Sequence, residues 1–194
     1  MKRGFKTACE NTAKKIRSDL NLEPHAPVDP RRLAQQQNIQ ILDPLNVADL
    51  PQATIDHLLG MGAQYWSAAA LKINSGYVIL YNSAHSLARQ TNDIMHEMAH
   101  VLLGHEPFQS CFSADVGLFM RYFDDDQEQE ADCWASTVLL PRDALFWAKK
   151  NNLGIDEIAN AFQVSTSLVN MRMNLSGVNR IYQRSEYLKN LSFN

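Results

Sequence analysis

The sequence has few cysteines and no long hydrophobic run. Its three cysteines, Cys9, Cys111 and Cys133, are widely spaced and form no CxxC pair, which argues against a disulfide framework. No stretch approaches the roughly 18 consecutive apolar residues that predict a membrane-spanning helix, and the basic N-terminus lacks the apolar segment of a signal peptide. We therefore expect a cytoplasmic protein with reduced thiols and no membrane segment.

The sequence also lacks an excess of basic residues. The formal net charge is −3 and the estimated pI is about 6.0, which excludes strong general affinity for nucleic acid or for anionic membranes. The acids are concentrated in residues 124–132 (DDDQEQEAD), where no base occurs. The 194 residues, 45% of them hydrophobic, are enough for one substantial domain with a small addition.

Hydrophobic periodicity and turn residues predict a mixture of helices and strands. Two apolar runs on either side of Asn74-Ser75-Gly76 predict a β-hairpin. Ser83 or Ser86 can cap a long helix that ends before Gly104, and a loop of roughly 20 residues then follows as a cover over a cleft. The remaining expected elements are helices at 4–20, 31–37, 126–139, 142–151, 155–162 and 166–174, and a strand at 39–42.

One short motif indicates a specific chemistry. Residues 96–100 read His-Glu-Met-Ala-His and match the pattern HExxH. Two histidines four residues apart lie one turn apart on the same helix face, so His96 and His100 can share one Zn²⁺. Glu97 is one step around the helix, where it can act as general base on a metal-bound water. Apolar residues occupy the other side of the helix, which predicts that the histidines face a cleft.

Spacing alone leaves the third metal ligand open. A catalytic zinc takes three protein ligands, and the acidic start of the next expected helix offers both Glu128 and Glu130. Acids in a first helical turn also suit the positive end of the helix dipole without any metal. From the residues alone, the two glutamates are equivalent candidates.

Longer segments around the motif are similar to a known family. HEMAHVLLGH followed by ExEADCWASTVLLP resembles the ImmA/IrrE family of metallo-endopeptidases, which pair HExxH with a later glutamate that opens a helix. The upstream segments PVDPRRLAQQQNIQI and YNSAHSLARQ are also similar, so the resemblance covers most of residues 25–142. Met98, Ala99 and the segment at 138–141 depart from the common family residues, and none of them is a candidate ligand.

The resemblance implies a zincin-like α+β fold, in which a small sheet packs on the HExxH helix, and zinc-dependent endopeptidase activity. His96, His100 and Glu130 would be the metal ligands, with Glu128 as the alternative to Glu130, and Glu97 would be the catalytic glutamate. Zn²⁺ is the expected metal, with Mn²⁺ as the alternative. The implied substrate is a regulatory protein, typically a helix-turn-helix repressor.

Other polar residues have two interpretations each. His105 is either a donor to the transition state or a histidine at the cleft rim, and Tyr81 and Tyr122 either stabilise an oxyanion or belong to the core. Asp93 either orients a ligand histidine or lies on the helix surface. The strand expected within residues 65–73 is either a sheet edge that binds substrate or an ordinary paired strand.

The C-terminal segment resembles a helix-turn-helix over residues 155–174. Its second helix offers Arg172 as the only charged residue among Asn170, Arg172 and Asn174, whereas DNA recognition normally requires a denser basic face. We therefore favour packing or partner binding over direct nucleic-acid binding. The expected division is a metallopeptidase domain at 1–143 and a helical segment at 144–194.

Two other functions compete with the peptidase interpretation. One is a metal-stabilised binding module that sequesters a transcriptional repressor without cleaving it. The other is a DNA-binding regulator that uses residues 155–174. Replacement of Glu97 separates the first from a peptidase, because only a peptidase needs a general base.

Overall fold

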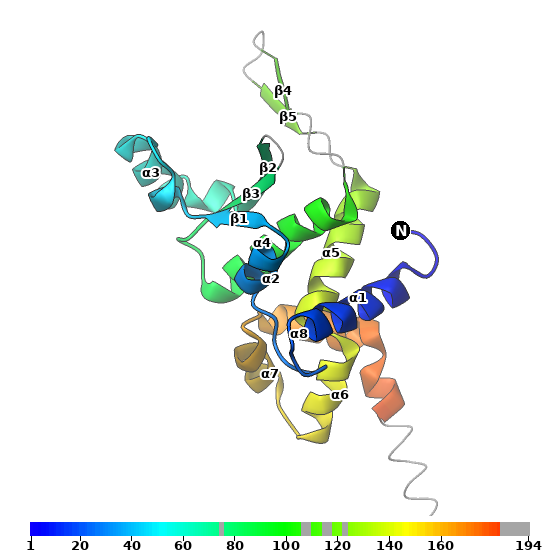
Figure 1. Cartoon of the computed structure of the whole chain (residues 1–194). Coiled ribbons are helices and arrows are strands. Elements are labelled where there is room, and N and C mark those ends of the chain that lie inside the picture. Colours follow the sequence, from blue (N-terminus) through cyan, green and yellow to red (C-terminus); the bar gives the residue numbers. More distant parts are fainter. Residues whose placement is uncertain (74–75, 106–109, 114–117, 122–123, 183–194) are drawn as a thin grey trace, which may run out of the picture.

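The computed structural model describes residues 1–73, 76–105, 110–113, 118–121 and 124–182. The protein has an α+β fold in which a small sheet and several helices surround two long helices, α4 and α5 (Figure 1). The helices are α1 (Phe5–Asp19), α2 (Pro30–Gln36), η1 (Pro44–Asn46), α3 (Gln52–Leu59), η2 (Ala63–Tyr65), α4 (Leu87–Leu103), α5 (Asp125–Leu139), α6 (Arg142–Lys150), α7 (Ile155–Phe162) and α8 (Thr166–Ser176). The strands are β1 (Ile39–Leu42), β2 (Ala68–Ile73), β3 (Gly76–Tyr81), β4 (Ser110–Ser113) and β5 (Leu118–Arg121).

Three strands form a mixed sheet in the order β1-β3-β2. β1 runs parallel to β3, with Ile39 opposite Tyr77, and β2 runs antiparallel to β3, with Ala70 opposite Ile79. The predicted hairpin is thus confirmed, although residues 74–75 of its turn lie outside the described residues. Within the described part of the chain, β2 is an edge strand of this sheet.

The segment between α4 and α5 differs from the continuous loop that the sequence predicted. β4 and β5 pair antiparallel there, with Ser110 opposite Arg121. Phe112 and Phe119 belong to a residue type that is enriched in strands. Strands of four residues, such as β4 and β5, are too short to show a clear hydrophobic period, so a sequence rich in polar residues around them is easily interpreted as a loop.

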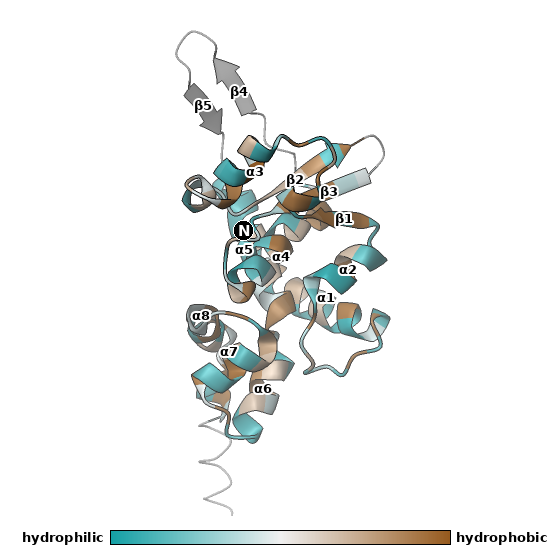
Figure 2. Cartoon of the chain, turned by 90° about the vertical axis from the view of Figure 1, so that its left-hand side faces the viewer, coloured by the Kyte–Doolittle hydropathy of each residue, from teal (hydrophilic) through white to brown (hydrophobic). Residues whose placement is uncertain are grey.

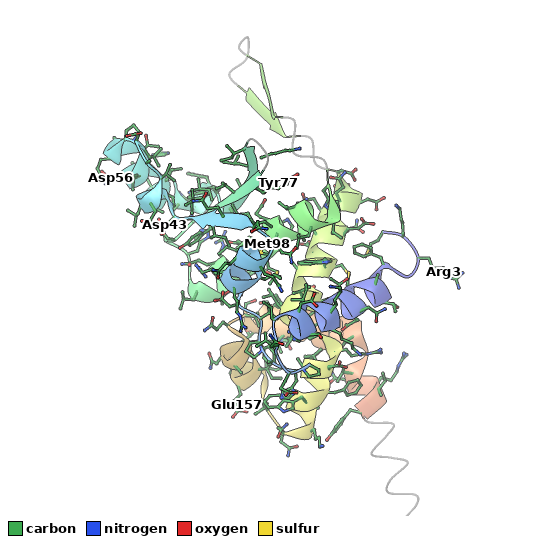
Figure 3. All side chains as sticks on the ribbon, viewed as in Figure 1. Arg3, Asp43, Asp56, Tyr77, Met98 and Glu157 are labelled. Carbon is green, nitrogen blue, oxygen red and sulfur yellow. The ribbon has the colours of Figure 1, made fainter. Side chains whose placement is uncertain are left out.

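Helix α4 begins and ends where its sequence predicts. The Ser86 side chain accepts a hydrogen bond from the Arg89 N–H, and Gly104 follows the helix in the left-handed conformation, with φ of 69°. Ile94, Met95 and Met98 are fully buried, and Figure 3 shows Met98 in the interior of the molecule. The apolar face of α4 therefore fixes the helix in the core, between the sheet and α5.

One apolar core extends from α1 to the C-terminal helices. Its buried members include Cys9 on α1, Met98 on α4, Leu145 on α6 and Val169 on α8. Figure 2 shows β1 in hydrophobic colour, whereas parts of α2 and α7 on the outside are hydrophilic. The division at residue 143 stays a prediction. None of the described helices is both long enough and apolar enough to cross a bilayer.

Candidate metal centre

Helices α4 and α5 bring two imidazoles and one carboxylate together. His96 Nε2 lies 3.1 Å from His100 Nε2. Glu128 Oε2 lies 3.3 Å from His96 Nε2, and Glu128 Oε1 lies 3.4 Å from His100 Nε2. Ligands on a tetrahedral zinc with bonds of about 2.0–2.1 Å are separated by about 3.3–3.4 Å. The donor set therefore fits a zinc ion in both chemistry and spacing.

The structure places Glu128, and not Glu130, beside the two histidines. Each helical residue turns by about 100°, so a step of two residues points Glu130 to a different side of α5. Glu130 Oε2 lies 3.7 Å from His105 Nε2 instead. The group of possible metal ligands among the described residues is His96, His100 and Glu128. The sequence favoured Glu130 over Glu128 as the third ligand, and the angle at which α5 meets α4 brings the alternative, Glu128, to the two histidines.

Asp132 contacts the other nitrogen of His96. Its Oδ1 lies 2.9 Å from His96 Nδ1, and a carboxylate at this nitrogen favours a proton on Nδ1, which leaves Nε2 as the nitrogen that can bind a metal. Asp132 was not predicted from the sequence, although its four-residue spacing from Glu128 puts both acids on one helix face.

Asp93, the residue proposed from the sequence for this orienting role, makes different contacts. Its Oδ2 lies 3.5 Å from His85 Nδ1 and 3.6 Å from Arg89 Nε. Asp93 therefore belongs to a polar cluster at the start of α4, one turn before the ligand pair.

Burial and neighbouring charges affect the two ligand histidines differently. Burial acts to lower the pKa of His96, but Asp132, Glu97 and Glu128 together raise it above its ordinary value. Burial, followed by the adjacent His96 and His105, lowers the pKa of His100 to about 4. His100 is therefore neutral at pH 7, which is the form that binds a metal.

Glu97 points from α4 to the edge of the sheet. Its Oε2 accepts a hydrogen bond of 2.9 Å from the Ala70 N–H. Hydrogen-bonded pairs alternate along an antiparallel ladder, and Asn82 N–H donates to Ser67 O at 2.8 Å. Ala69 and Leu71 therefore also face β3, whereas Ala68, Ala70 and Lys72 direct their backbone groups to the open side.

A cleft of about 490 Å³ adjoins these groups. Residues from η2, β2, α4 and α5 line it, among them Tyr65, Arg89, His96, Glu97 and Glu128. Tyr65 is 80% exposed and forms part of the rim. A larger hollow of about 560 Å³ lies between α1, α5 and α8 and contains neither ligand histidine. Two of the candidate metal ligands, His96 and Glu128, therefore line the smaller cleft, together with Glu97.

The remaining candidate residues have other contacts. The Tyr81 hydroxyl lies 3.5 Å from Asp43 Oδ2, and the Arg31 guanidinium lies over the Tyr81 ring. Tyr122 lies outside the described residues. The His105 side chain is 7% exposed, and its Nε2 lies 3.7 Å from Glu130 Oε2.

Comparisons with known proteins show which family the chain resembles. The model of a family described as Peptidase_M78, the IrrE N-terminal-like domain, matches residues 35–174. A solved structure described as a Mycobacterium tuberculosis transcriptional regulator is similar with a TM-score of 0.49 and 12% identity, over 89% of this chain and 47% of that chain. This chain thus spans about half the length of that regulator. Curated proteins gave no match. Because the family model covers most of the sequence, the chain belongs to the Peptidase_M78 family.

Proposed function

We propose that this protein is a zinc-dependent endopeptidase. His96, His100 and Glu128 hold the metal, and Glu97 is the general base. The observation that supports this most strongly is the convergence of two Nε2 atoms and one carboxylate within 4.8 Å of one another, with Glu97 at an open strand edge. Bound zinc supplies the Lewis acidity that makes water nucleophilic at neutral pH.

Glu97 has two tasks in this proposal. Its carboxylate accepts a proton from the attacking water and then donates it to the leaving amine of the cleaved peptide bond. The residue follows His96 in sequence, and its carboxylate accepts the Ala70 N–H of β2. It is therefore held at the cleft, and it lies outside the group of possible metal ligands among the described residues.

The substrate in this proposal is an extended segment of a protein. The outward backbone groups of Ala68 and Lys72, and the carbonyl of Ala70, can pair with such a segment by strand addition. A strand bound there would pass directly beside Glu97, because Glu97 already accepts the Ala70 N–H. The resemblance to the ImmA/IrrE family supports a regulatory protein, such as a helix-turn-helix repressor, as the natural substrate.

Replacement of Glu97 by glutamine tests the activity. We expect Glu97→Gln to retain stoichiometric zinc and to lower the hydrolysis of unfolded casein by about 100-fold or more, since the general base is lost. Asp125→Asn, which removes an exposed carboxylate from α5, is the matched control and should hydrolyse casein normally. Full hydrolysis by Glu97→Gln would refute the mechanism. Zinc-loaded wild-type protein that cleaves neither casein nor a peptide library would instead favour the binding module.

Alanine replacements test the third ligand. We expect Glu128→Ala to lose bound zinc, because two imidazoles alone leave the site one protein ligand short. Glu130→Ala should retain most of its zinc. Elemental analysis of both purified variants measures this difference, and loss of zinc from Glu130→Ala alone would show that Glu130 is the ligand.

A further inference from the structure

We infer that His105 and Glu130 form a positioning pair that holds the ligand His100 in its metal-binding tautomer. This inference rests on the proposed zinc site. It gives a role to two residues that the metal site itself does not use. Neither residue is within the group of possible ligands among the described residues.

The contacts form a line that leads away from the metal site. His105 Nδ1 lies 3.0 Å from His100 Nδ1, and His105 Nε2 lies 3.7 Å from Glu130 Oε2. The His105 side chain is 7% exposed, and its buried Nε2 has Glu130 as an ion-pair neighbour but no hydrogen-bond partner within the described residues. A buried polar nitrogen directed at a carboxylate indicates a paired function rather than simple packing.

The end of α4 places His105 in this position. Gly104 adopts the left-handed conformation, with φ of 69°, and the His105 N–H donates to His100 O at 3.0 Å. This turn brings the chain back along α4, so that His105 lies next to His100 instead of continuing the helix. The rings of His100 and His105 meet edge to face, with centroids 5.0 Å apart.

Proton positions along this line are linked. When His100 Nε2 is bare to face a metal, the neutral ring carries its proton on Nδ1 and donates it to His105 Nδ1. His105 must then carry its own proton on Nε2, which faces the Glu130 carboxylate. Glu130 therefore favours the one tautomer of His105 that leaves His100 Nε2 available.

The two ligand histidines are thus oriented by different means. Asp132 contacts His96 Nδ1 directly, at 2.9 Å, whereas Glu130 reaches His100 through His105. Both acids come from α5, which also supplies Glu128. Three acids of α5, Glu128, Glu130 and Asp132, therefore contact histidines at or next to the site, and among these acids only Glu128 faces both Nε2 atoms.

Zinc affinity, measured by competition with a chelator, tests the inference. We expect His105→Phe, which keeps a ring but removes the acceptor, to weaken zinc binding by about 10–100-fold. His105→Asn, which keeps an acceptor near the Nδ1 position, should recover most of that loss. Glu130→Gln should weaken binding in the same direction, and the loss in the double variant should be less than additive, because Glu130 acts through His105. Asp125→Asn controls for the removal of one charge from α5.

Nuclear magnetic resonance of the wild-type protein gives a second measurement that needs no variant. In the zinc-loaded protein, ¹⁵N shifts should show His100 protonated on Nδ1 and His105 protonated on Nε2. The opposite tautomer of His105, or unchanged zinc affinity in a folded His105→Phe, would overturn the positioning pair. Wild-type protein that binds no zinc would instead overturn the proposed function, so the two failures are distinguishable.

Discussion

At the scale of single residues, neighbouring groups change the pKa of the Cys133 thiol on α5. A hydrogen bond from the Cys9 thiol is the main reason that the pKa of Cys133 is lowered to about 7, with Arg172 and Lys6 acting in the same direction. The hydrogen bond with Cys133, together with burial, raises the pKa of Cys9. Cys133 is half-buried and lines the hollow between α1, α5 and α8.

We predict that iodoacetamide modifies Cys133 with a midpoint near pH 7 and leaves Cys9 unmodified in the folded protein. The thiolate is the nucleophile. The rate of alkylation therefore rises as the pH increases through the pKa of Cys133 in the folded protein, and it is low at pH values below that pKa. Peptide mapping by mass spectrometry, in a Cys111→Ser background, measures both sites. Cys9→Ala should shift the Cys133 midpoint upward, and a wild-type midpoint at about 8.5, the ordinary thiol pKa, would contradict the prediction.

The candidate site was predictable only where one helix determines it. His96, Glu97 and His100 follow from the motif because helix geometry fixes their relative directions. The position of Glu128, rather than Glu130, beside the two histidines could not follow, since it depends on the angle between α5 and α4. His105 was missed as a possible partner of His100 for a related reason, because the turn at Gly104 reverses the chain and no periodicity continues through it.

At the scale of elements, successive backbone N–H groups of β2 point alternately into the sheet and to its open edge. Ala69 N–H faces β3, whereas Ala70 N–H faces Glu97. Proline removes a backbone donor and is tolerated on the outward side of an edge strand, but not within the ladder. Proline substitutions at the adjacent residues Ala69 and Ala70 therefore form a matched pair, because only the first removes an N–H from the ladder.

We predict that Ala70→Pro folds and retains zinc but hydrolyses casein at least tenfold more slowly, because Glu97 loses its partner and the edge loses a donor. Ala69→Pro should instead destabilise the protein by about 1–3 kcal/mol, through the lost ladder bond. Urea unfolding and casein hydrolysis of the two variants separate these effects. Normal hydrolysis by Ala70→Pro would show that the Ala70 N–H does not position Glu97 for catalysis.

Local signals predicted the elements well and their arrangement poorly. The strand at 39–42 and the helices after Pro141 agree with the structure within a few residues, because proline, glycine and capping side chains mark their ends. The parallel pairing of β1 with β3 was not predicted, since it joins strands separated by α3 and β2. Pairing over such distances leaves no periodic signal in either strand.

At the scale of the whole molecule, Arg172 joins the C-terminal helices to the N-terminus. Its side chain on α8 is about 5% exposed. Arg172 Nε donates to Leu140 O at 2.9 Å, and the second guanidinium nitrogen donates to Glu10 Oε1 at 2.7 Å. Glu10 Oε2 accepts the Arg142 N–H at 3.0 Å. The one charged side chain that the sequence analysis considered for DNA contact on α8 is therefore used inside the protein.

We predict that Glu10→Ala lowers the free energy of unfolding by about 3 kcal/mol, because it leaves the Arg172 guanidinium buried without its counter-charge. The double variant Glu10→Ala with Arg172→Met should recover part of that loss, since an apolar side chain in the same space needs no partner. Urea unfolding of the three variants measures both effects.

Duplex DNA should bind neither wild type nor Arg172→Met at low or moderate salt, because α8 has no dense basic face for phosphates. Salt-dependent DNA binding that Arg172→Met abolishes without a loss of stability would show instead that Arg172 serves recognition rather than the fold.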